Sequence, residues 1–195
     1  FALINAEQMV VTPEFKQAIG QLIKTVAEES FNISSDINVM VGVDTSGSMS
    51  CKVTDTLSCL NIASLFGAMV KKSHAKTEVF AVATKMKKVD LAKQDDVFHM
   101  AEEIKRVDVG YGTYFEQIMK NYKEEKYVIL ITDSEPADNL EKEWLKANKP
   151  EGAKLIVWQL MPYDKKISRH SSVVYLAGYS DRMLGLIKNI IEGKA

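Results

Sequence analysis

Two nearly continuous apolar runs constrain the fold of this chain most, because each has the length of a strand and each leads to an aspartate. Residues 37–43 precede Asp44, and residues 127–131 precede Thr132 and Asp133. Apolar runs rich in β-branched residues are typical of parallel strands that are buried on both faces. If these two strands are neighbours in a parallel sheet, their aspartates meet in one crevice beyond the carboxyl ends of the strands.

Segments with apolar residues at helical spacing separate the predicted strands. Strands are expected over 37–43, 78–84, 127–132, 153–160 and 172–176, with a short polar hairpin partner over 85–91. Helices are expected over 15–31, 54–72, 95–106, 114–122 and 139–147, and a last helix after a cap at Ser180 and Asp181. This alternation predicts an α/β fold with a doubly wound, mostly parallel central sheet, helices on both faces and one short antiparallel edge strand.

Composition narrows the possible classes of protein. A chain of 195 residues, 46% hydrophobic and 26% charged, is large enough for one domain with its own core. A net charge of −1 without a basic block lacks the electrostatic signature of a dedicated nucleic-acid binder. No apolar run is long enough to span a bilayer and no secretory signal is found, so we expect no membrane association and a cytoplasmic location. Because the chain begins at Phe1 rather than Met, we expect a fragment or processed part of something longer.

Hydroxyl and carboxylate side chains occur in three segments of the sequence. The candidate metal ligands are Asp44, Ser46, Ser48, Thr113 and Asp133. Such hard oxygen donors suit Mg²⁺, and equally Mn²⁺ or Ca²⁺. Taken singly, three of these residues have a simpler explanation: the serines could end a strand and cap the next helix, and Asp133 could be a turn residue.

In this order, the five candidates resemble the metal-ion-dependent adhesion site (MIDAS) of von Willebrand factor A (vWA) domains, and the resemblance covers the chain from Ile37 to Ile191. It implies a Rossmann-like vWA fold in which Ser46, Ser48 and Thr113 coordinate the ion directly. It also implies that Asp44 and Asp133 act mostly through water. Neutral hydroxyls leave the ion electron-poor, so a Glu or Asp carboxylate from a protein partner completes its coordination.

Within this superfamily, the chain is most similar to the C-terminal domain of Ro-type (TROVE) RNA-binding proteins. The similar segments are residues 153–157, 176–179 and 186–189 and the helix over 15–31. In that family a ring of helical repeats precedes the domain and binds noncoding and misfolded RNAs, but no such repeats occur here. RNA is therefore expected only through a longer parent protein or assembly. We expect residues 1–35 to form a segment and helix that pack on a vWA domain formed by residues 36–195.

The sequence departs from the vWA pattern around the candidate site. Tyr111 separates Gly110 from Gly112, where many vWA domains have two adjacent glycines, and the second strand ends in Ala83-Thr84, where Phe-Ser is common. The aromatic residues around Thr113 predict a partner-binding rim, although Tyr111 could instead pack on its own loop. This predicted rim consists of Tyr111, Tyr114, Ser134 and Glu135.

The remaining reactive or charged side chains favour simple structural roles. Two cysteines make no disulfide framework and fit a reducing compartment. Nothing beside Cys51 indicates a lowered pKa, so an inert thiol is favoured over chemistry near the ion. Cys59 is predicted in a helix core. The histidines lack metal-ligand spacing and are predicted at the surface or in loops: His74, His99 and His170. A group of three lysines is predicted to lie on a solvated hairpin, and a contact with phosphate or RNA is the alternative. These lysines are Lys85, Lys87 and Lys88.

Two classes of function stay open beside an RNA-associated module. No nucleophile–base pair is evident, so a binding module is favoured and no enzymatic activity is expected. The alternative is a Mg²⁺-dependent phosphatase-like hydrolase, because an aspartate at the end of a first strand is also the nucleophile in haloacid-dehalogenase-like phosphatases. Those enzymes usually have a second aspartate two residues later, where this chain has Ser46.

Overall fold

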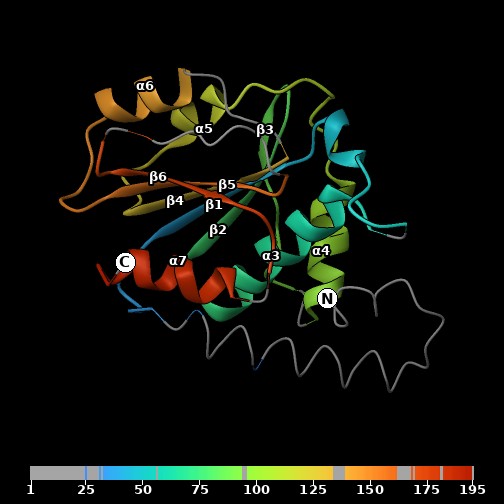
Figure 1. Cartoon of the computed structure of the whole chain (residues 1–195), viewed down its shortest axis with the longest axis horizontal. Coiled ribbons are helices and arrows are strands. Elements are labelled where there is room, and N and C mark those ends of the chain that lie inside the picture. The colour runs from blue at the N-terminus through green and yellow to red at the C-terminus, as the bar shows by residue number, and fades with distance from the viewer. Residues whose placement is uncertain are drawn as a thin grey trace.

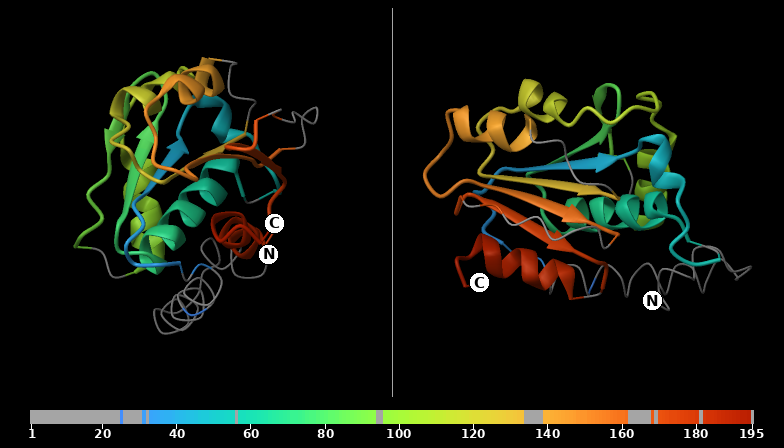
Figure 2. Two further views of the ribbon diagram at one scale, coloured as in Figure 1. Left: turned by 90° about the vertical axis from the view of Figure 1, so that its left-hand side faces the viewer. Right: turned by 45° about the horizontal axis from the view of Figure 1, so that its top comes forward.

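Six strands form one sheet with helices on both of its faces (Figure 1 and Figure 2). The computed structural model describes residues 25, 31, 33–55, 57–93, 96–133, 139–161, 168, 170–180 and 182–194. The predicted helix over 15–31 and the packing of residues 1–35 lie almost entirely outside these residues. No helix among the described residues is long and apolar enough to cross a membrane.

The strand order places the two predicted aspartate-bearing strands side by side. The strands are β1 (Val39–Asp44), β2 (Thr77–Val82), β3 (Met86–Lys88), β4 (Tyr127–Thr132), β5 (Lys154–Gln159) and β6 (Val173–Ala177). Their order is β3-β2-β1-β4-β5-β6, and every pair is parallel except β2 with β3. The predicted doubly wound sheet with one short antiparallel edge strand is confirmed. Strand order reverses between β1 and β4, which is the position where such sheets bind ligands.

The alternation of side chains along the central strands divides the core into two clusters. Val39, Val41 and Val43 belong to the cluster under α3 (Cys59–Ser73), α4 (Val97–Arg106) and α7 (Met183–Ile191). Met40 belongs to the opposite cluster, under α5 (Glu116–Asn121) and α6 (Asn139–Lys146). Figure 1 shows these two helical layers on opposite sides of the sheet. Since β1 and β4 are buried along their whole length, their continuous apolar runs are explained.

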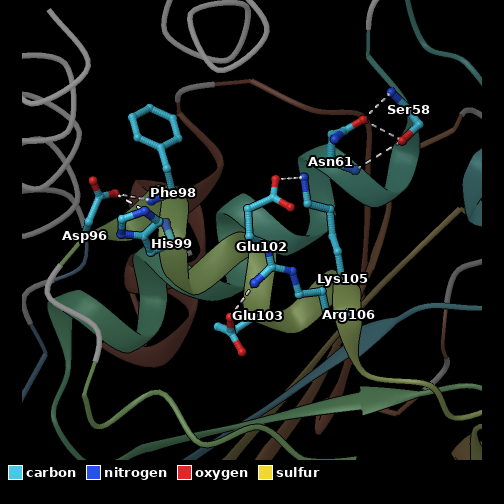
Figure 3. Close-up of polar contacts among 9 residues, drawn as sticks. All are labelled: Ser58, Asn61, Asp96, Phe98, His99, Glu102, Glu103, Lys105 and Arg106. Atoms are coloured by element: carbon cyan, nitrogen blue, oxygen red, sulfur yellow. Dashed lines mark hydrogen bonds and ion pairs between the residues drawn. The ribbon is translucent and has the colours of Figure 1, made fainter. Parts of the chain in front are cut away.

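Helix α3 begins later than the sequence predicts. Its first turn is set by a capping box in which the Ser58 hydroxyl accepts from the Asn61 amide and the Asn61 side chain accepts from the Ser58 amide (Figure 3). Leu57, predicted on the inner face of the helix, is buried but precedes it. The reciprocal cap satisfies two amides that would otherwise lack partners, so residues 51–55, 57 and 58 lie outside the helix.

The last helix also differs at its start. Helix α7 begins at Met183 after Arg182, which makes no side-chain capping bond. The Ser180 hydroxyl accepts a hydrogen bond from the Arg182 amide at 3.3 Å, so it supports the turn before the helix. Asp181, the other predicted cap, lies outside the described residues.

His74 is buried rather than at the surface, because it joins three segments at the C-terminal end of α3. Its Nε2 donates to the Ser34 carbonyl and its Nδ1 lies 3.2 Å from the Thr77 hydroxyl. Burial lowers the pKa of this imidazole. His74 lies in the loop that follows α3, so the loop alternative of the prediction holds, whereas the surface alternative is wrong because its polar atoms find protein partners.

Helix α3 and strand β1 approach so closely that only glycine fits between them. A Cβ on Gly67 would lie 2.7 Å from the Cγ2 atom of Val43. Val43 directly precedes Asp44, so this contact also sets the height of the helix over the end of the strand. The helix propensity of Gly67 is poor, and close packing is the physical reason for its presence.

We predict that Gly67→Ala destabilises the protein by about 1–3 kcal/mol, the usual cost of overpacking a core, despite a helix-propensity gain of at most about 1 kcal/mol. Gly185→Ala is the matched control, because a Cβ at Gly185 in α7 meets nothing within 4 Å. It should stabilise the protein by about 0.5–1 kcal/mol. Urea denaturation of both variants measures these changes, and equal effects of the two substitutions would contradict the packing argument.

Candidate metal centre

Asp44 is held at the carboxyl end of β1 by groups from strand β4 and from the segment that follows β1. Its Oδ2 accepts a hydrogen bond from the Thr132 hydroxyl on β4 at 2.6 Å, and its Oδ1 accepts from the Ser46 amide at 2.8 Å. The residue is fully buried. Burial raises the pKa of the Asp44 carboxyl, and the nearby Asp133 carboxylate adds to this, whereas the hydrogen bonds from Thr132 and Ser46 act in the opposite direction.

A chain of hydroxyls joins the segment after β1 to Asp133. The Ser46 and Ser48 hydroxyl oxygens lie 3.1 Å apart, and the Ser48 hydroxyl donates to Asp133 Oδ1 at 3.1 Å. Because the single Ser48 proton goes to Asp133, Ser46 is the donor between the two serines. Ser46 and Asp133 are buried, whereas Ser48 is exposed on the short 3₁₀ helix η1 (Gly47–Ser50). The hydroxyl chain therefore leads from the buried strand ends to the surface.

Asp133 makes two further contacts with the segment after β1. Its Oδ2 lies 3.8 Å from the Cys51 sulfur, which is a weak thiol donor. Its backbone amide lies 3.2 Å from the sulfur of Met49, a fully buried residue of η1. Together with the hydrogen bond from Ser48 to Asp133, these contacts hold η1 and Cys51 against the end of β4.

The loop that carries Thr113 is anchored between β2 and η1. The Tyr111 carbonyl accepts from the Gly47 amide at 3.1 Å, and the Thr84 hydroxyl accepts from the Gly112 amide at 2.9 Å. The Tyr114 amide donates to the Ala83 carbonyl at 3.2 Å. These bonds hold Thr113 within one residue of two anchors, at the same edge of the sheet as the other candidates.

Two glycines of this loop are required by its close approach to Thr84. Gly110 has a φ of +87°, and a Cβ there would lie 2.7 Å from the Thr84 hydroxyl oxygen. A Cβ on Gly112 would lie 3.1 Å from that same oxygen and 2.9 Å from the Tyr114 ring. The interposed Tyr111 is accommodated because its side chain is directed to solvent and is 86% exposed.

Four of the five predicted ligands are therefore joined by hydrogen bonds: Asp44, Ser46, Ser48 and Asp133. Thr113 is exposed in the neighbouring loop, and among the described residues no hydrogen bond joins its side chain to the other four. In the predicted rim, Tyr111 and Tyr114 are exposed, the latter by 50%. Ser134 and Glu135 lie outside the described residues.

The donor set fits a hard divalent cation with waters. Among the described residues, neither Asp44 nor Asp133 forms an ion pair with a lysine or arginine. Two adjacent buried carboxylates without a cation are electrostatically costly, which favours a bound positive charge. Within the described ranges, no three His, Cys, Asp and Glu side chains are grouped to hold a metal by themselves. The candidate set instead combines two carboxylates with three hydroxyls.

This geometry agrees with the comparison with known protein families. The family model described as Ro60 vWA domain matches residues 38–191, which is most of the chain. The chain belongs to this Ro60 vWA family. No curated protein matches the sequence significantly.

Solved structures support the vWA fold. The crystal structure of the Deinococcus radiodurans RO (RSR) protein is similar with a TM-score of 0.63 and 14% identity, over 84% of this chain and 36% of that one. This vWA chain thus spans about a third of that protein. An aerotolerance-related membrane protein from Bacteroides fragilis NCTC 9343, carrying multiple mutations to serines, is similar with a TM-score of 0.53 and 12% identity, over 82% of this chain and 100% of that one. At these identities, both likenesses show the fold alone.

The sequence did not reveal two residues that hold the backbone next to the candidate ligands of this vWA site. Thr84 was noted only as a departure from the family pattern, yet its hydroxyl anchors the loop of Thr113. Met49 was not considered, although its sulfur contacts the Asp133 amide. Only strand pairing and loop packing create these contacts, so no local sequence signal reveals them.

We predict that Thr84→Ala loosens the loop before α5, because the Gly112 amide loses its acceptor. The cost should be about 0.5–1.5 kcal/mol, the net contribution of one hydrogen bond. Thr84→Ser keeps the hydroxyl and is the matched control. Hydrogen exchange at the Gly112 amide measures the effect, and equal exchange rates in both variants would show that Thr84 does not anchor the loop.

Proposed function

We propose that this chain is a divalent-metal-dependent protein-binding module with a MIDAS-type site. Ser46, Ser48 and Thr113 would bind Mg²⁺ directly, and Asp44 and Asp133 would act through water. The observation that carries the proposal is the hydrogen-bonded convergence of Asp44, Ser46, Ser48 and Asp133 at the switch point between β1 and β4. Ligand sites of open α/β sheets occur at this position.

Each residue has a distinct task in this proposal. Thr132 and the Ser46 amide hold the Asp44 carboxylate in place, so its orientation does not depend on the ion. Ser48 is an exposed residue, so an ion held there remains accessible from outside. When bound, Mg²⁺ would supply a Lewis-acidic centre that accepts an oxygen from a second molecule.

The proposed partner is a protein that supplies a Glu or Asp carboxylate. Neutral hydroxyls dominate the direct ligands, so an ion held by them keeps much of its positive charge and attracts an anionic oxygen. Tyr111 and Tyr114 are the large exposed aromatic side chains beside this position. Aromatic side chains are enriched at protein interfaces because they combine a large apolar area with a polar end. They would therefore form the rim that contacts the partner around its carboxylate.

The hydrolase alternative receives little support from the geometry. A phosphatase nucleophile has to reach a phosphorus atom, but Asp44 is fully buried and both of its oxygens accept hydrogen bonds. We propose that the chain is not an enzyme. The assay is phosphatase turnover with Mg²⁺, in which activity above that of Asp44→Asn would revive the alternative.

We further propose that the chain works within a larger Ro-like ribonucleoprotein. Its membership in the Ro60 vWA family and its span of 36% of the Deinococcus RO protein support this assignment. Among the basic residues around β3, Lys88 is already paired with Glu78. RNA would accordingly be reached through the rest of the assembly.

We predict that wild-type protein binds Mg²⁺ and Mn²⁺, and that Asp44→Asn weakens binding by roughly 10–100-fold. This is the usual effect of replacing a residue that orients the metal ligands without binding the ion directly. The asparagine oxygen can still accept from Ser46 and its amide can donate to Thr132, so the fold is retained. Asp36→Asn is the matched control, because the Asp36 side chain is 93% exposed. Isothermal titration calorimetry measures the affinities. Equal binding by all three proteins would reject the site.

We predict that peptides selected on the immobilised full chain in Mg²⁺ are released by EDTA and depend on one carboxylate. The reason is that the carboxylate oxygen would complete the coordination of the ion. Replacement of the critical Glu by Gln should abolish capture, and so should Thr113→Ala in the chain. Capture that survives EDTA or the Gln substitution would show that this surface binds partners without the ion.

A further inference from the structure

The two cysteines of the chain lie in contact at the edge of the candidate metal centre. Their sulfur atoms are 2.9 Å apart, and both are free thiols. Cys51 follows η1, whereas Cys59 is the first residue of α3. This contact is unexpected from the sequence, which favours an inert Cys51 and a core position for Cys59.

The backbone between the cysteines is compatible with a disulfide. Lys52 and Ser58 form an antiparallel bridge, so Cys51 and Cys59 face each other at the next position. The Cys59 amide donates to the Cys51 carbonyl at 3.0 Å. Residues directly opposite each other in antiparallel pairs have Cα atoms about 4.5–5.5 Å apart, within the range of roughly 4.4–6.8 Å that disulfides span. Bond formation therefore needs only a small movement of the side chains.

The two thiols differ in their access to solvent. Cys51 is partly exposed, whereas Cys59 is fully buried. A small oxidant in solution therefore reaches Cys51 first. The buried Cys59 thiol is already beside it, in the position of a resolving cysteine.

We propose that Cys51 and Cys59 form a reversible redox pair that hydrogen peroxide converts to an intramolecular disulfide, and that this oxidation weakens metal binding at the adjacent site. In the first step the Cys51 sulfur attacks one peroxide oxygen, the O–O bond breaks, and sulfenic acid and water form. In the second step the Cys59 sulfur attacks the Cys51 sulfur, the S–O bond breaks, and a second water leaves. Two electrons pass from the two thiols to the peroxide, and a dithiol reductant reverses the change.

The link to the metal centre runs through two contacts of Cys51 and rests on the proposed function. The Cys51 thiol has one proton, which lies between the Cys59 sulfur at 2.9 Å and Asp133 Oδ2 at 3.8 Å, and a disulfide has no such proton. The Cys51 amide donates to the Ser48 carbonyl at 2.8 Å, so movement of Cys51 is transmitted to the exposed ligand serine. Because Cys59 is fixed in the first turn of α3, Cys51 is the residue that moves.

The experiment uses the full chain, reduced and then treated with hydrogen peroxide. Maleimide labelling after unfolding in urea and intact mass spectrometry should find a monomer that has lost two hydrogen atoms and takes up no label, and dithiothreitol should restore two labelling sites. Calorimetry with Mg²⁺ should then give an affinity about twofold lower for the oxidised protein, the lower end of the effect of losing one hydrogen bond, because the thiol is a weak donor. Cys59→Ser is the matched control, in which peroxide leaves Cys51 without its disulfide partner.

The two readouts separate this inference from the proposed function. Two labelled thiols after peroxide treatment, or a disulfide only between chains, would overturn the redox pair whatever the metal result. A disulfide with unchanged Mg²⁺ affinity would overturn the coupling. If the reduced protein binds no Mg²⁺, the metal proposal and the coupling fail together, but the mass measurement still decides whether the cysteines are a redox pair.

Discussion

The parallel pairing of β1 with β4 is the constraint on which the site depends. It brings Asp44 and Asp133, far apart in the sequence, to the same edge of the sheet. The two strands are fully buried, so their pairing is held by the apolar clusters on both faces. The polar site therefore exists because a hydrophobic core fixes the register of the strands that carry it.

Burial of two carboxylates is unfavourable unless other groups compensate it. The chain compensates partly with hydrogen bonds from Thr132, the Ser46 amide and the Ser48 hydroxyl. These groups are neutral, so they orient the carboxylates without cancelling their charge. The same arrangement that leaves Asp44 with a raised pKa therefore makes a cation favourable at the proposed site.

Close packing fixes the positions of the segments around the site, which the chemistry of the candidate ligands does not determine. Gly67 lets α3 approach Val43, just before Asp44, and Gly110 lets the loop of Thr113 pass over Thr84. The turn before α3 brings Cys51 beside Cys59 and Asp133. The candidate metal site, its loop and the thiol pair thus share one small region at the carboxyl edge of the sheet.

The sequence by itself determined the approximate positions of the strands and the α/β class, because these depend on local apolar patterns, and it supplied the candidate ligands as a prediction from motifs within a few residues. It also placed β4 correctly to the residue. It did not determine the start of α3 at Cys59, where a reciprocal cap outweighs the helical pattern that begins earlier. Only the tertiary structure decided the burial of His74, the anchoring by Thr84 and the contact between the cysteines. These depend on segments that meet through packing, and apolar periodicity carries no information about which polar partners then become neighbours.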